Sequence, residues 1–240
     1  MAEITYEFHE KLSNKIWHDN AVKENIKKKL IDLVYFWMEE SKIPSDLIED
    51  IVLTGSYAGY NYTPYSDIDV HIILDKSKLG CDKLIDDFLF DKKKLFAEKH
   101  KISINETPVE IYPQDMHEKI PANEAVYSLL HNKWLIEPSK QKIDITNPRL
   151  LKKSRFYKRL IKKLIREGNI KKIMDVKAKI RRMRQAGLNK EGEFSVENIV
   201  YKDLRNRNLL DELDEKLNKL IDRRYSIWMF FTFIIINWVD

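Results

Sequence analysis

Two carboxylates lie one residue apart in an apolar segment of this 240-residue chain. Asp67 and Asp69 alternate with Ile68 and Val70, which is typical of a strand with one apolar face, so both carboxylates point to the other face. Two like charges this close repel each other unless a cation lies between them. Because Mg²⁺ prefers oxygen ligands of this kind, we predict that Asp67 and Asp69 bind Mg²⁺.

A third acid lies in a similar setting. Glu110 belongs to the segment TPVEIYP, residues 107–113, which is predicted to form a short apolar strand. If this strand neighbours that of Asp69, three carboxylates converge, and three acids can hold two Mg²⁺ ions, or Mn²⁺ in their place. Two such ions clamp the attacking and leaving oxygens of a phosphoryl or nucleotidyl transfer. We therefore predict Asp67, Asp69 and Glu110 as catalytic residues and metal ligands.

Small residues precede these acids. Gly55 lets the backbone approach a phosphate, and Ser56 can add a hydrogen bond at the start of a predicted short helix, where backbone N–H groups attract anions. Ser66 directly precedes Asp67 and either begins the strand or braces the site. Gly55, Ser56 and Ser66 are our candidates for nucleotide binding. His71 shares the face of the acids, and a contact with substrate and a structural role are both open for it.

The loop between Ser56 and Asp67 is rich in tyrosine. Its members are Tyr57, Tyr60, Tyr62 and Tyr65. We favour packing of this loop over the core, and a stacking wall for a nucleobase or ribose is the alternative.

The order and spacing of these residues follow a known pattern. A Gly-Ser pair is followed after ten residues by Asp-hydrophobic-Asp-hydrophobic, and later by an acid between hydrophobic residues. This pattern resembles the nucleotidyltransferase superfamily, whose fold is shared by DNA polymerase β, poly(A) polymerases and CCA-adding enzymes. The resemblance implies that Gly55 and Ser56 bind the phosphates of an NTP and that Asp67 and Asp69 ligate both metal ions. It implies that Glu110 ligates the catalytic ion and helps to deprotonate the attacking hydroxyl. Two further segments resemble nucleotidyltransferase-domain proteins of large bacteriophages: VYSLLHNKWLIEP at 126–138 and MRQAGLNKEGEFSVENIVYKDLR at 183–205.

The positive charge is concentrated in one segment. The whole chain carries +5, whereas residues 151–190 hold sixteen Lys and Arg and two acids, which gives +14 there and −9 elsewhere. A polyanion such as tRNA or another RNA would be held there through its backbone. The alternatives are a solvated helical face and, by the resemblance above, a cation that reaches the NTP triphosphate. The candidates for that cation are Lys152, Lys153, Arg155, Lys158, Arg159 and Lys162.

Hydrophobic periodicity predicts a mixed region followed by a helical one. In the mixed region it predicts helices at 21–42, 45–50, 82–99 and 121–131, and strands at 51–54, 67–74, 109–112 and 133–136. From Pro148 onward it predicts helices only. The predicted fold class is α+β, with a small mixed β-sheet nucleotidyltransferase core and flanking helices, followed by a helical C-terminal domain. We predict a catalytic domain at 1–140, a basic helical domain at 148–227 and an apolar tail at 228–240.

Within the helical domain, apolar spacing and capping residues predict faces and ends. One helix face is predicted to be apolar and buried, with Phe156, Leu160, Leu164 and Ile165. Gly187 predicts a helix end, and Ser195 predicts the N-cap of the following helix.

Other features concern location and partners. The single cysteine excludes a disulfide framework, and the polar N-terminal residues lack the apolar core of a secretory signal, so we expect a cytoplasmic protein. The stretch WMFFTFIIINWV, residues 228–239, is shorter than the roughly 20 residues that span a bilayer. We expect this tail to be buried or to contact a partner. The oligomeric state is open.

The sequence thus predicts a Mg²⁺-dependent nucleotidyltransferase that moves a nucleoside monophosphate from an NTP to an acceptor hydroxyl, with RNA as one candidate acceptor. A synthase of a nucleotide second messenger, in which the acceptor is another nucleotide, is the alternative among enzymes. A non-catalytic nucleotide- or RNA-binding module, or an antitoxin-like protein, is the alternative from another class. The intact trio of acids argues against a decayed site. Neither the base of the NTP nor the acceptor follows from the sequence.

Overall fold

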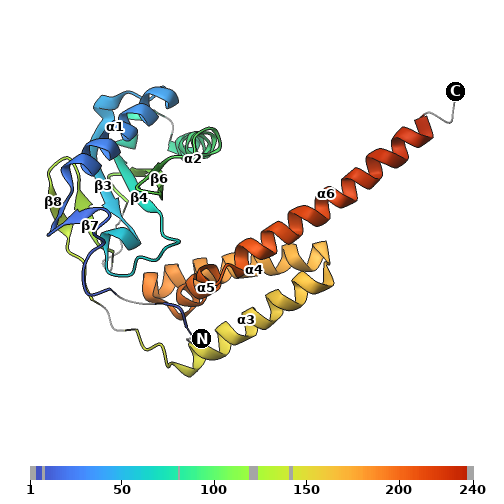
Figure 1. Ribbon diagram of the computed structural model, residues 1–240. Coiled ribbons are helices and arrows are strands. Elements are labelled where there is room, and N and C mark those ends of the chain that lie inside the picture. Colours follow the sequence, from blue (N-terminus) through green and yellow to red (C-terminus); the bar gives the residue numbers. More distant parts are fainter. Residues whose placement is uncertain (1–3, 7–8, 81, 119–123, 141–142, 237–240) are drawn as a thin grey trace. The chain divides into compact units, whose positions relative to one another are not determined.

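The computed structural model describes residues 4–6, 9–80, 82–118, 124–140 and 143–236. For residues 82, 83 and 227–236 it describes the backbone only. The chain forms two compact units (Figure 1), one of residues 7–141 and one of residues 1–6 with 142–240.

The unit of residues 7–141 is built on a mixed sheet of six strands in the order β5-β6-β4-β3-β7-β8. Strands β4 and β6 are parallel, whereas the other neighbouring pairs of this sheet are antiparallel. The elements in chain order are β1 (Trp17–His18), β2 (Ala21–Val22), α1 (Glu24–Ser41), η1 (Ser45–Leu47), β3 (Ile48–Thr54), η2 (Ser56–Ala58), β4 (Ile68–Leu74), η3 (Lys76–Leu79), α2 (Asp82–Lys99), β5 (Ser103–Ile104), β6 (Thr107–Asp115), β7 (Val126–Ser128) and β8 (Lys133–Ile136). The sheet and the helices that follow it confirm the predicted α+β class.

One face of this sheet is covered by α1 and α2. Ile68, Val70 and Ile72 of β4 are fully buried and belong to one core cluster with residues of both helices, among them Trp37 and Phe96. Burying a large aliphatic side chain contributes about 1.5–3 kcal/mol. The alternation that buries these residues also sends Asp69 and His71 to the opposite face, which is the arrangement that positions the site.

Most predicted elements of this unit form, with shifted ends. The helix at 82–99 and the strand at 133–136 have the predicted bounds, and α1 begins at Glu24 because Ala21 and Val22 pair in a small hairpin. The prediction of a helix at 121–131 is wrong, because Val126–Ser128 form β7 between β3 and β8. Pairing on both sides outweighs the helical spacing of this short segment, whose residues 119–123 lie outside the described part of the chain.

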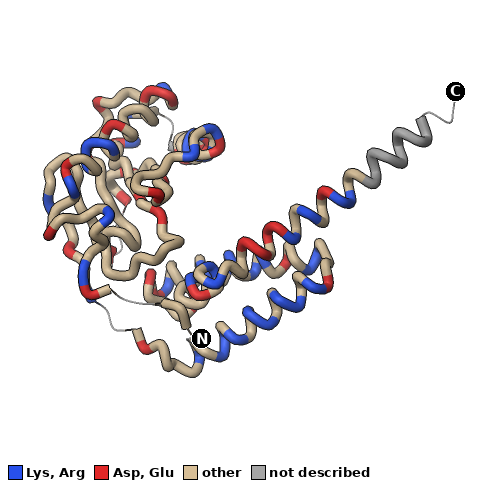
Figure 2. The backbone as a smooth tube through the Cα atoms, in the orientation of Figure 1, with Lys and Arg blue, Asp and Glu red and all other residues tan. Residues whose placement is uncertain are grey.

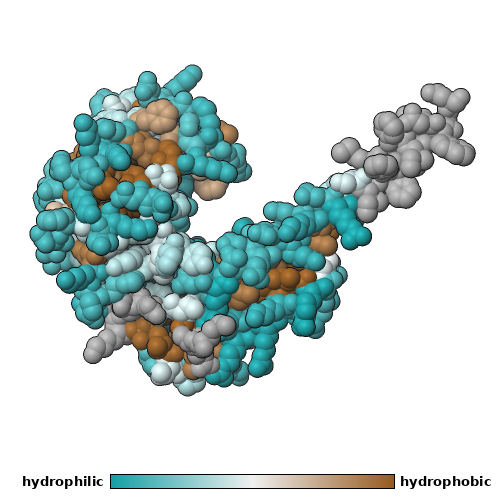
Figure 3. Space-filling model, viewed as in Figure 1, coloured by the Kyte–Doolittle hydropathy of each residue, from teal (hydrophilic) through white to brown (hydrophobic). Residues whose placement is uncertain are grey.

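The second unit is helical, as predicted. Its elements are α3 (Pro148–Glu167), α4 (Ile170–Glu191), η4 (Gly192–Phe194), α5 (Val196–Asn206) and α6 (Leu209–Ile236). The side chains of Asn147, Asn169 and Ser195 accept hydrogen bonds from backbone N–H groups of the helices that they precede, so the predicted N-cap at Ser195 is confirmed. Lys and Arg residues follow one another along α3 (Figure 2), and apolar side chains reach the surface of this unit between hydrophilic ones (Figure 3).

Two predictions for the helical unit are wrong. Leu164 is buried as predicted, but Phe156 is 52% exposed, and Tyr157 and Ile161 complete the buried face in its place. Gly187 does not end a helix, since α4 continues to Glu191. A Cβ atom on Gly187 would lie 2.6 Å from the Oγ atom of Ser195, so a glycine is needed here for the close approach of the segment that begins α5.

A buried carboxylate joins the chain's first described residues to this unit. Asp203 is 0% exposed and accepts hydrogen bonds from the backbone N–H and the hydroxyl of Thr5, both at 2.9 Å, and from Ser154 at 2.6 Å. The Nε of Arg207 donates to it at 3.0 Å, and the Nζ of Lys158 lies 3.6 Å away. Residues 4–6 therefore belong to the helical unit, whereas the sequence grouped them with residues up to 140.

The predicted apolar tail coincides with the last turns of α6. The helical backbone continues to Ile236, and the side chains from residue 227 onward lie outside the described part. Among the described residues, none of the helices has the length and apolar character needed to cross a membrane. Burial of the tail or contact with a partner stays a prediction.

Candidate active site

The register of the sheet brings two of the predicted acids side by side. Parallel strands β4 and β6 pair Asp69 with Glu110 and His71 with Tyr112, and Thr54 of β3 pairs with Asp69 from the other side. Neighbouring strands lie about 4.8 Å apart, so these carboxylates start from adjacent positions on one face. The condition set by the sequence, that the strand of Glu110 neighbours that of Asp69, is met.

Asp67 lies just before the first paired residue of β4. It directly precedes Ile68, the first residue of β4, and is half-buried like Asp69. Its position therefore depends on the turn that ends at Ser66, and not on strand pairing. Ser66 is 2% exposed, and its hydroxyl accepts a hydrogen bond from the N–H of Thr63 at 2.9 Å. Of its two predicted roles, these contacts favour bracing the segment that delivers Asp67.

Gly55 lies directly against the carboxylate of Asp69. Its φ of 71° is in the region that favours glycine, and a Cβ atom there would lie 2.0 Å from the Oδ2 atom of Asp69. Any other residue would have to displace that carboxylate. The next residue, Ser56, is 8% exposed and begins η2. The turn after β3 thus places the backbone of Gly55, which has no side chain, beside the carboxylate of Asp69.

The tyrosines of this turn have different surroundings. Tyr57 is 3% exposed and accepts a hydrogen bond on its backbone oxygen from the indole of Trp17 at 2.7 Å. Tyr62 stacks on Tyr57 at 5.7 Å and on His9 at 3.8 Å between ring centroids. Tyr65 is 42% exposed. Tyr57 and Tyr62 therefore pack into the unit, in agreement with the favoured interpretation, whereas Tyr65 lies at the surface.

His71 is held by a neighbour on the same face. Burial lowers the pKa of its imidazole, and the hydrogen bond to Gln114 acts in the opposite direction. Its Nδ1 lies 2.6 Å from the Oε1 of Gln114, an atom that can only accept, so Nδ1 carries the hydrogen in this arrangement. The ring also lies 5.0 Å from that of Tyr112. These contacts are sufficient for a structural role of His71. They involve its Nδ1 atom and its ring, whereas Nε2 lies on the opposite side of the ring from Nδ1.

Sequence reasoning missed Lys93, a residue of α2. Its Nζ lies 3.8 Å from the Oε2 of Glu110 and 4.6 Å from the centre of the Tyr112 ring. The helix that carries Lys93 was predicted, but its sequence, DKKKL, does not say which of three lysines faces β6. Only the packing of α2 beside β6 makes that distinction.

The carboxylates fit a divalent cation in chemistry and in strand placement. In the described part of the chain, no three Asp, Glu, His or Cys side chains are gathered closely enough to hold a metal ion. The side chain of Glu110 is 56% exposed and lies near Lys93, so it must turn from this lysine to join the other two. The absence of a side chain at Gly55 lets the Asp69 carboxylate lie against the backbone there, and the donors are the oxygens that Mg²⁺ prefers.

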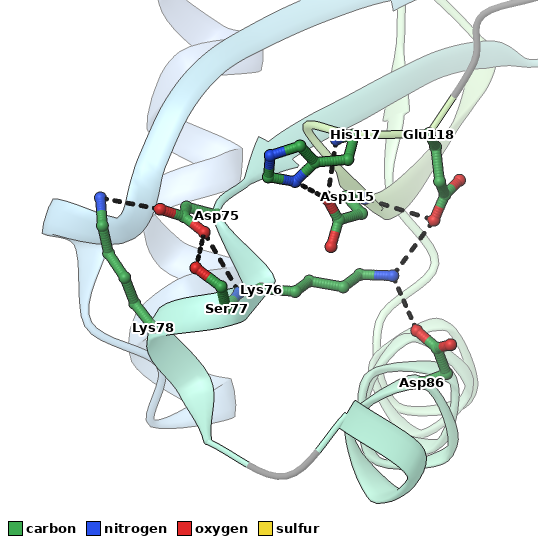
Figure 4. Close-up of polar contacts among 8 residues, drawn as sticks. All are labelled: Asp75, Lys76, Ser77, Lys78, Asp86, Asp115, His117 and Glu118. Carbon is green, nitrogen blue, oxygen red and sulfur yellow. Dashed lines mark hydrogen bonds and ion pairs between the residues drawn. The ribbon is translucent and has the colours of Figure 1, made fainter.

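The opposite end of the same strands holds a second group of acids (Figure 4). The Nζ of Lys76, after β4, lies 2.8 Å from Asp86 of α2 and 3.2 Å from Glu118. Burial alone would lower the pKa of Lys76, but its hydrogen bonds to Asp86 and Glu118 raise it, so the lysine stays charged. Asp115 accepts hydrogen bonds from the backbone N–H of His117 at 2.7 Å and from its ring at 2.9 Å. These acids have cationic or donor partners within the chain and fasten α2 to the ends of β4 and β6.

Comparisons with known proteins agree with this geometry at the level of a domain. The family model described as "Nucleotidyltransferase domain" matches residues 38–180, which contain every residue of the predicted site. A comparison with curated proteins gave no match. The resemblance to bacteriophage proteins stays a prediction.

Two solved structures are similar over most of the chain. The CdnE cyclic dinucleotide synthase of Elizabethkingia meningoseptica, solved with GTP and Apcpp, is 15% identical with a TM-score of 0.29, over 83% of this chain and 76% of that one. The STING-associated CdnE c-di-GMP synthase of Capnocytophaga granulosa is 15% identical with a TM-score of 0.23, over 85% and 84%. Similarity at this level says nothing about the substrate of this chain.

Proposed function

The chain belongs to the nucleotidyltransferase domain family and is a nucleotidyltransferase, and we propose that it transfers a nucleoside monophosphate from an NTP to an acceptor hydroxyl. The acceptor oxygen forms a bond to the α-phosphorus as the bond from that phosphorus to the bridging oxygen breaks. The bond's electron pair leaves with pyrophosphate, and the hydroxyl proton passes to Glu110 and then to solvent. The observation that carries this proposal is the pairing of Asp69 with Glu110 beside the bare backbone of Gly55.

Each residue of the site has a stated task in this proposal. Asp67, Asp69 and Glu110 would hold Mg²⁺, or Mn²⁺ in its place, with Glu110 turning away from Lys93 to do so. The bound cations would neutralise phosphate charge and favour the alkoxide form of the acceptor. Gly55 and Ser56 would bind the β- and γ-phosphates through backbone N–H groups and the serine hydroxyl. Strand pairing sets Asp69 beside Glu110 before substrate arrives, so the main rearrangement on binding would be the turn of the Glu110 side chain.

We propose further that the helical unit binds nucleic acid as the acceptor or as a guide to it. Support comes from an exposed basic surface along α3, in which Phe156 and Leu160 alternate with cations. Its basic members are Lys152, Arg155, Arg159 and Lys163. Glu167 and Asp175 are the only acids among residues 151–190, so the α3 surface has few opposing charges of its own segment. Backbone phosphates would pair with these cations, and a base could stack on Phe156.

Thermal unfolding tests the metal and nucleotide part of the proposal. Each NTP with Mg²⁺ is added to the whole chain, and the right NTP should raise the midpoint, since ligand at about 100 times its Kd stabilises by about 2.7 kcal/mol. The shift should disappear in EDTA and in Asp67→Asn/Asp69→Asn. The control Asp32→Asn/Asp91→Asn makes the same charge change at exposed positions of α1 and α2 and should keep the shift. If no NTP with Mg²⁺ or Mn²⁺ shifts the midpoint, the proposal is wrong.

A labelling experiment identifies the acceptor. The protein is incubated with each α-labelled NTP and Mg²⁺, with and without total RNA. Label in RNA supports the nucleic-acid acceptor, and Lys152→Gln/Arg159→Gln should then reduce the transfer and its dependence on salt. Label in a small, phosphatase-resistant product formed without RNA would instead identify the second-messenger synthase. Label in neither, with thermal stabilisation retained, would point to a nucleotide-binding module.

A further inference from the structure

A groove of about 620 Å³ lies at one edge of the sheet, between α1, α2 and the edge formed by β5 and β6. Strand β5 covers only the start of β6, because Ser103 and Ile104 pair with Pro108 and Thr107 and no further. The rest of that edge of β6 faces α2. The volume is in the range of small-molecule sites, which are about 300–1,000 Å³.

The floor and walls of this groove are aromatic. Trp37 of α1 is fully buried, Phe96 of α2 is 9% exposed and Phe90 of α2 is 62% exposed, so aromatic rings extend from floor to rim. The indole N–H of Trp37 is buried and has no hydrogen-bond partner. With 0% of its surface exposed, this N–H is closed off from ligands, and Trp37 contributes only to the apolar floor. The groove thus offers a flat apolar surface.

The rim of the groove is positive. Lys93, Lys94 and Lys101 line it, whereas Glu110 is its one acid. Lys94 and Lys101 are exposed, and neither has an ion pair with any described residue. His100, which also lines the groove, lies 3.4 Å from Glu40 and is thereby engaged. Two free ammonium groups beside an aromatic wall are suited to an organic anion with a ring.

We propose that this groove binds a nucleoside phosphate, separately from the catalytic site. The base enters between α2 and β6 and packs against Phe90, which is 62% exposed. The phosphate pairs with Lys94 and Lys101 at the rim. A base supplies the flat ring and the phosphate supplies the charge, so the one molecule meets both features of the groove.

Of the three proposed catalytic acids, Glu110 also lines the groove. Lys93 lines the groove and lies 3.8 Å from Glu110, so a phosphate at the rim would compete with this carboxylate for the lysine. The groove does not depend on Asp67, on Asp69 or on a metal ion. Its occupation can therefore be tested where the catalytic site is disabled.

The test is calorimetric titration of the whole chain with AMP in EDTA, which removes metal-dependent NTP binding. Saturable binding is expected, and it should persist in Asp67→Asn/Asp69→Asn. Lys94→Gln/Lys101→Gln should weaken it about tenfold or more, and Phe90→Ala, which removes the exposed ring at the rim, about fivefold. Ala97→Trp, an exposed position on the groove, should abolish it by filling the entrance.

Matched controls separate the groove from general effects of charge. Lys28→Gln/Lys29→Gln removes the same charge from exposed positions of α1 away from the groove and should leave the affinity unchanged. Ribose 5-phosphate, without a base, and adenosine, without a phosphate, should each bind at least about tenfold more weakly than AMP. Three results would each overturn the proposal: no saturable binding of AMP up to about 1 mM, unchanged binding in Lys94→Gln/Lys101→Gln, or ribose 5-phosphate binding as tightly as AMP. Thermal unfolding of every variant verifies its folding, and the exposed lysine variant tests the proposal even if Ala97→Trp does not fold.

Discussion

The two ends of the parallel pair β4 and β6 both hold acids, but in different surroundings. At the end that follows Leu74, Lys76 lies 2.8 Å from Asp86 and 3.2 Å from Glu118 (Figure 4). At the starting end, Glu110 has Lys93 at 3.8 Å, with a side chain that is 56% exposed. The first group is fastened by close contacts between helix and sheet, whereas the second is ordered mainly by strand register.

This difference concerns what places the acids of each group. The ion pairs of Lys76 with Asp86 and Glu118 join helix to sheet and stabilise the fold. Asp69 and Glu110 are set side by side by the pairing of β4 with β6, and Gly55 lies directly against the carboxylate of Asp69. Like charges placed so near each other cost free energy unless a cation joins them. Mutations at the two ends should therefore affect different properties.

The largest effect is expected at Asp69. Asp69→Asn removes a charge but keeps the shape, so nucleotidyl transfer should fall about a thousandfold, or about 4 kcal/mol of transition-state stabilisation, because the proposed metal ligand is lost. The free energy of unfolding should change by less than about 1 kcal/mol, since repulsion among the acids is also relieved. Initial rates of transfer and denaturant unfolding measure the two quantities. A variant with full activity would place the catalytic acids elsewhere.

Asp203 in the helical unit extends the comparison to an acid that is fully partnered. Asp203→Asn should lower the free energy of unfolding of that unit by about 3 kcal/mol, because Arg207 and Lys158 lose a buried counter-charge. The exposed Asp175→Asn is the matched control and should have little effect. Equal stability of the two variants would contradict the role of Asp203.

The pH dependence of this unit has a defined sign. Burial by itself would raise the pKa of Asp203, but hydrogen bonds from Ser154 and Thr5 and the charge of Arg207 lower it overall. A lowered pKa means that this stabilisation is complete above the unfolded value of about 3.9. It is lost as the pH falls from there through the folded pKa. Unfolding followed by circular dichroism should show the advantage of the native chain over Asp203→Asn shrinking in that window.

Gly55 tests whether backbone shape at the starting end matters separately from charge. In Gly55→Ala the new Cβ would displace the Asp69 carboxylate, so transfer should fall about a hundredfold, as small misplacements at a reacting centre do. Gly80→Ala is the control, because Gly80 also has positive φ, at 105°, and a Cβ atom there would meet no described atom within 4 Å apart from its chain neighbours. Both variants should lose about 1–2 kcal/mol of stability from backbone strain. Equal activity of the two would exclude the proposed contact of Gly55 with the acids.

Local patterns predicted the strand faces and most element positions. Alternation along Ile68–Leu74 separates buried from polar side chains, and the structure follows it. Ser195 caps α5 because a short polar side chain at that position bonds only to nearby backbone. These features depend on interactions between residues that are close in sequence, so local sequence patterns are sufficient to predict them.

The features that sequence reasoning missed depend on packing between distant segments. β7 has three residues and is defined by its pairing with β3 and β8. The hydrophobic periodicity of so short a segment does not reveal this pairing. α3 has two apolar stripes, and only its neighbours decide that Tyr157 is buried and Phe156 exposed. The pairing of Asp69 with Glu110 was anticipated only on the condition that their strands are neighbours. Predicting the contact of Lys93 with Glu110 requires the orientation of α2. That orientation is set by packing in the core and not by the sequence of the helix itself.

Lys76 gives the smallest effect and the most direct test of the comparison. Lys76→Met should lower the free energy of unfolding by about 1 kcal/mol, because its partners Asp86 and Glu118 are largely exposed and solvent screens them. Nucleotidyl transfer should be unchanged, since the contacts lie at the end of β4 far along the strand from Asp69. The pKa of Lys76 is raised in the folded protein, so its contribution is complete below the unfolded value of about 10.4 and is lost as the pH rises through the folded pKa. The difference in unfolding free energy between wild type and Lys76→Met should accordingly be constant near neutral pH and shrink only in strong alkali. A loss of transfer without a loss of stability would show that the two ends of β4 do not have the separate roles that their acids indicate.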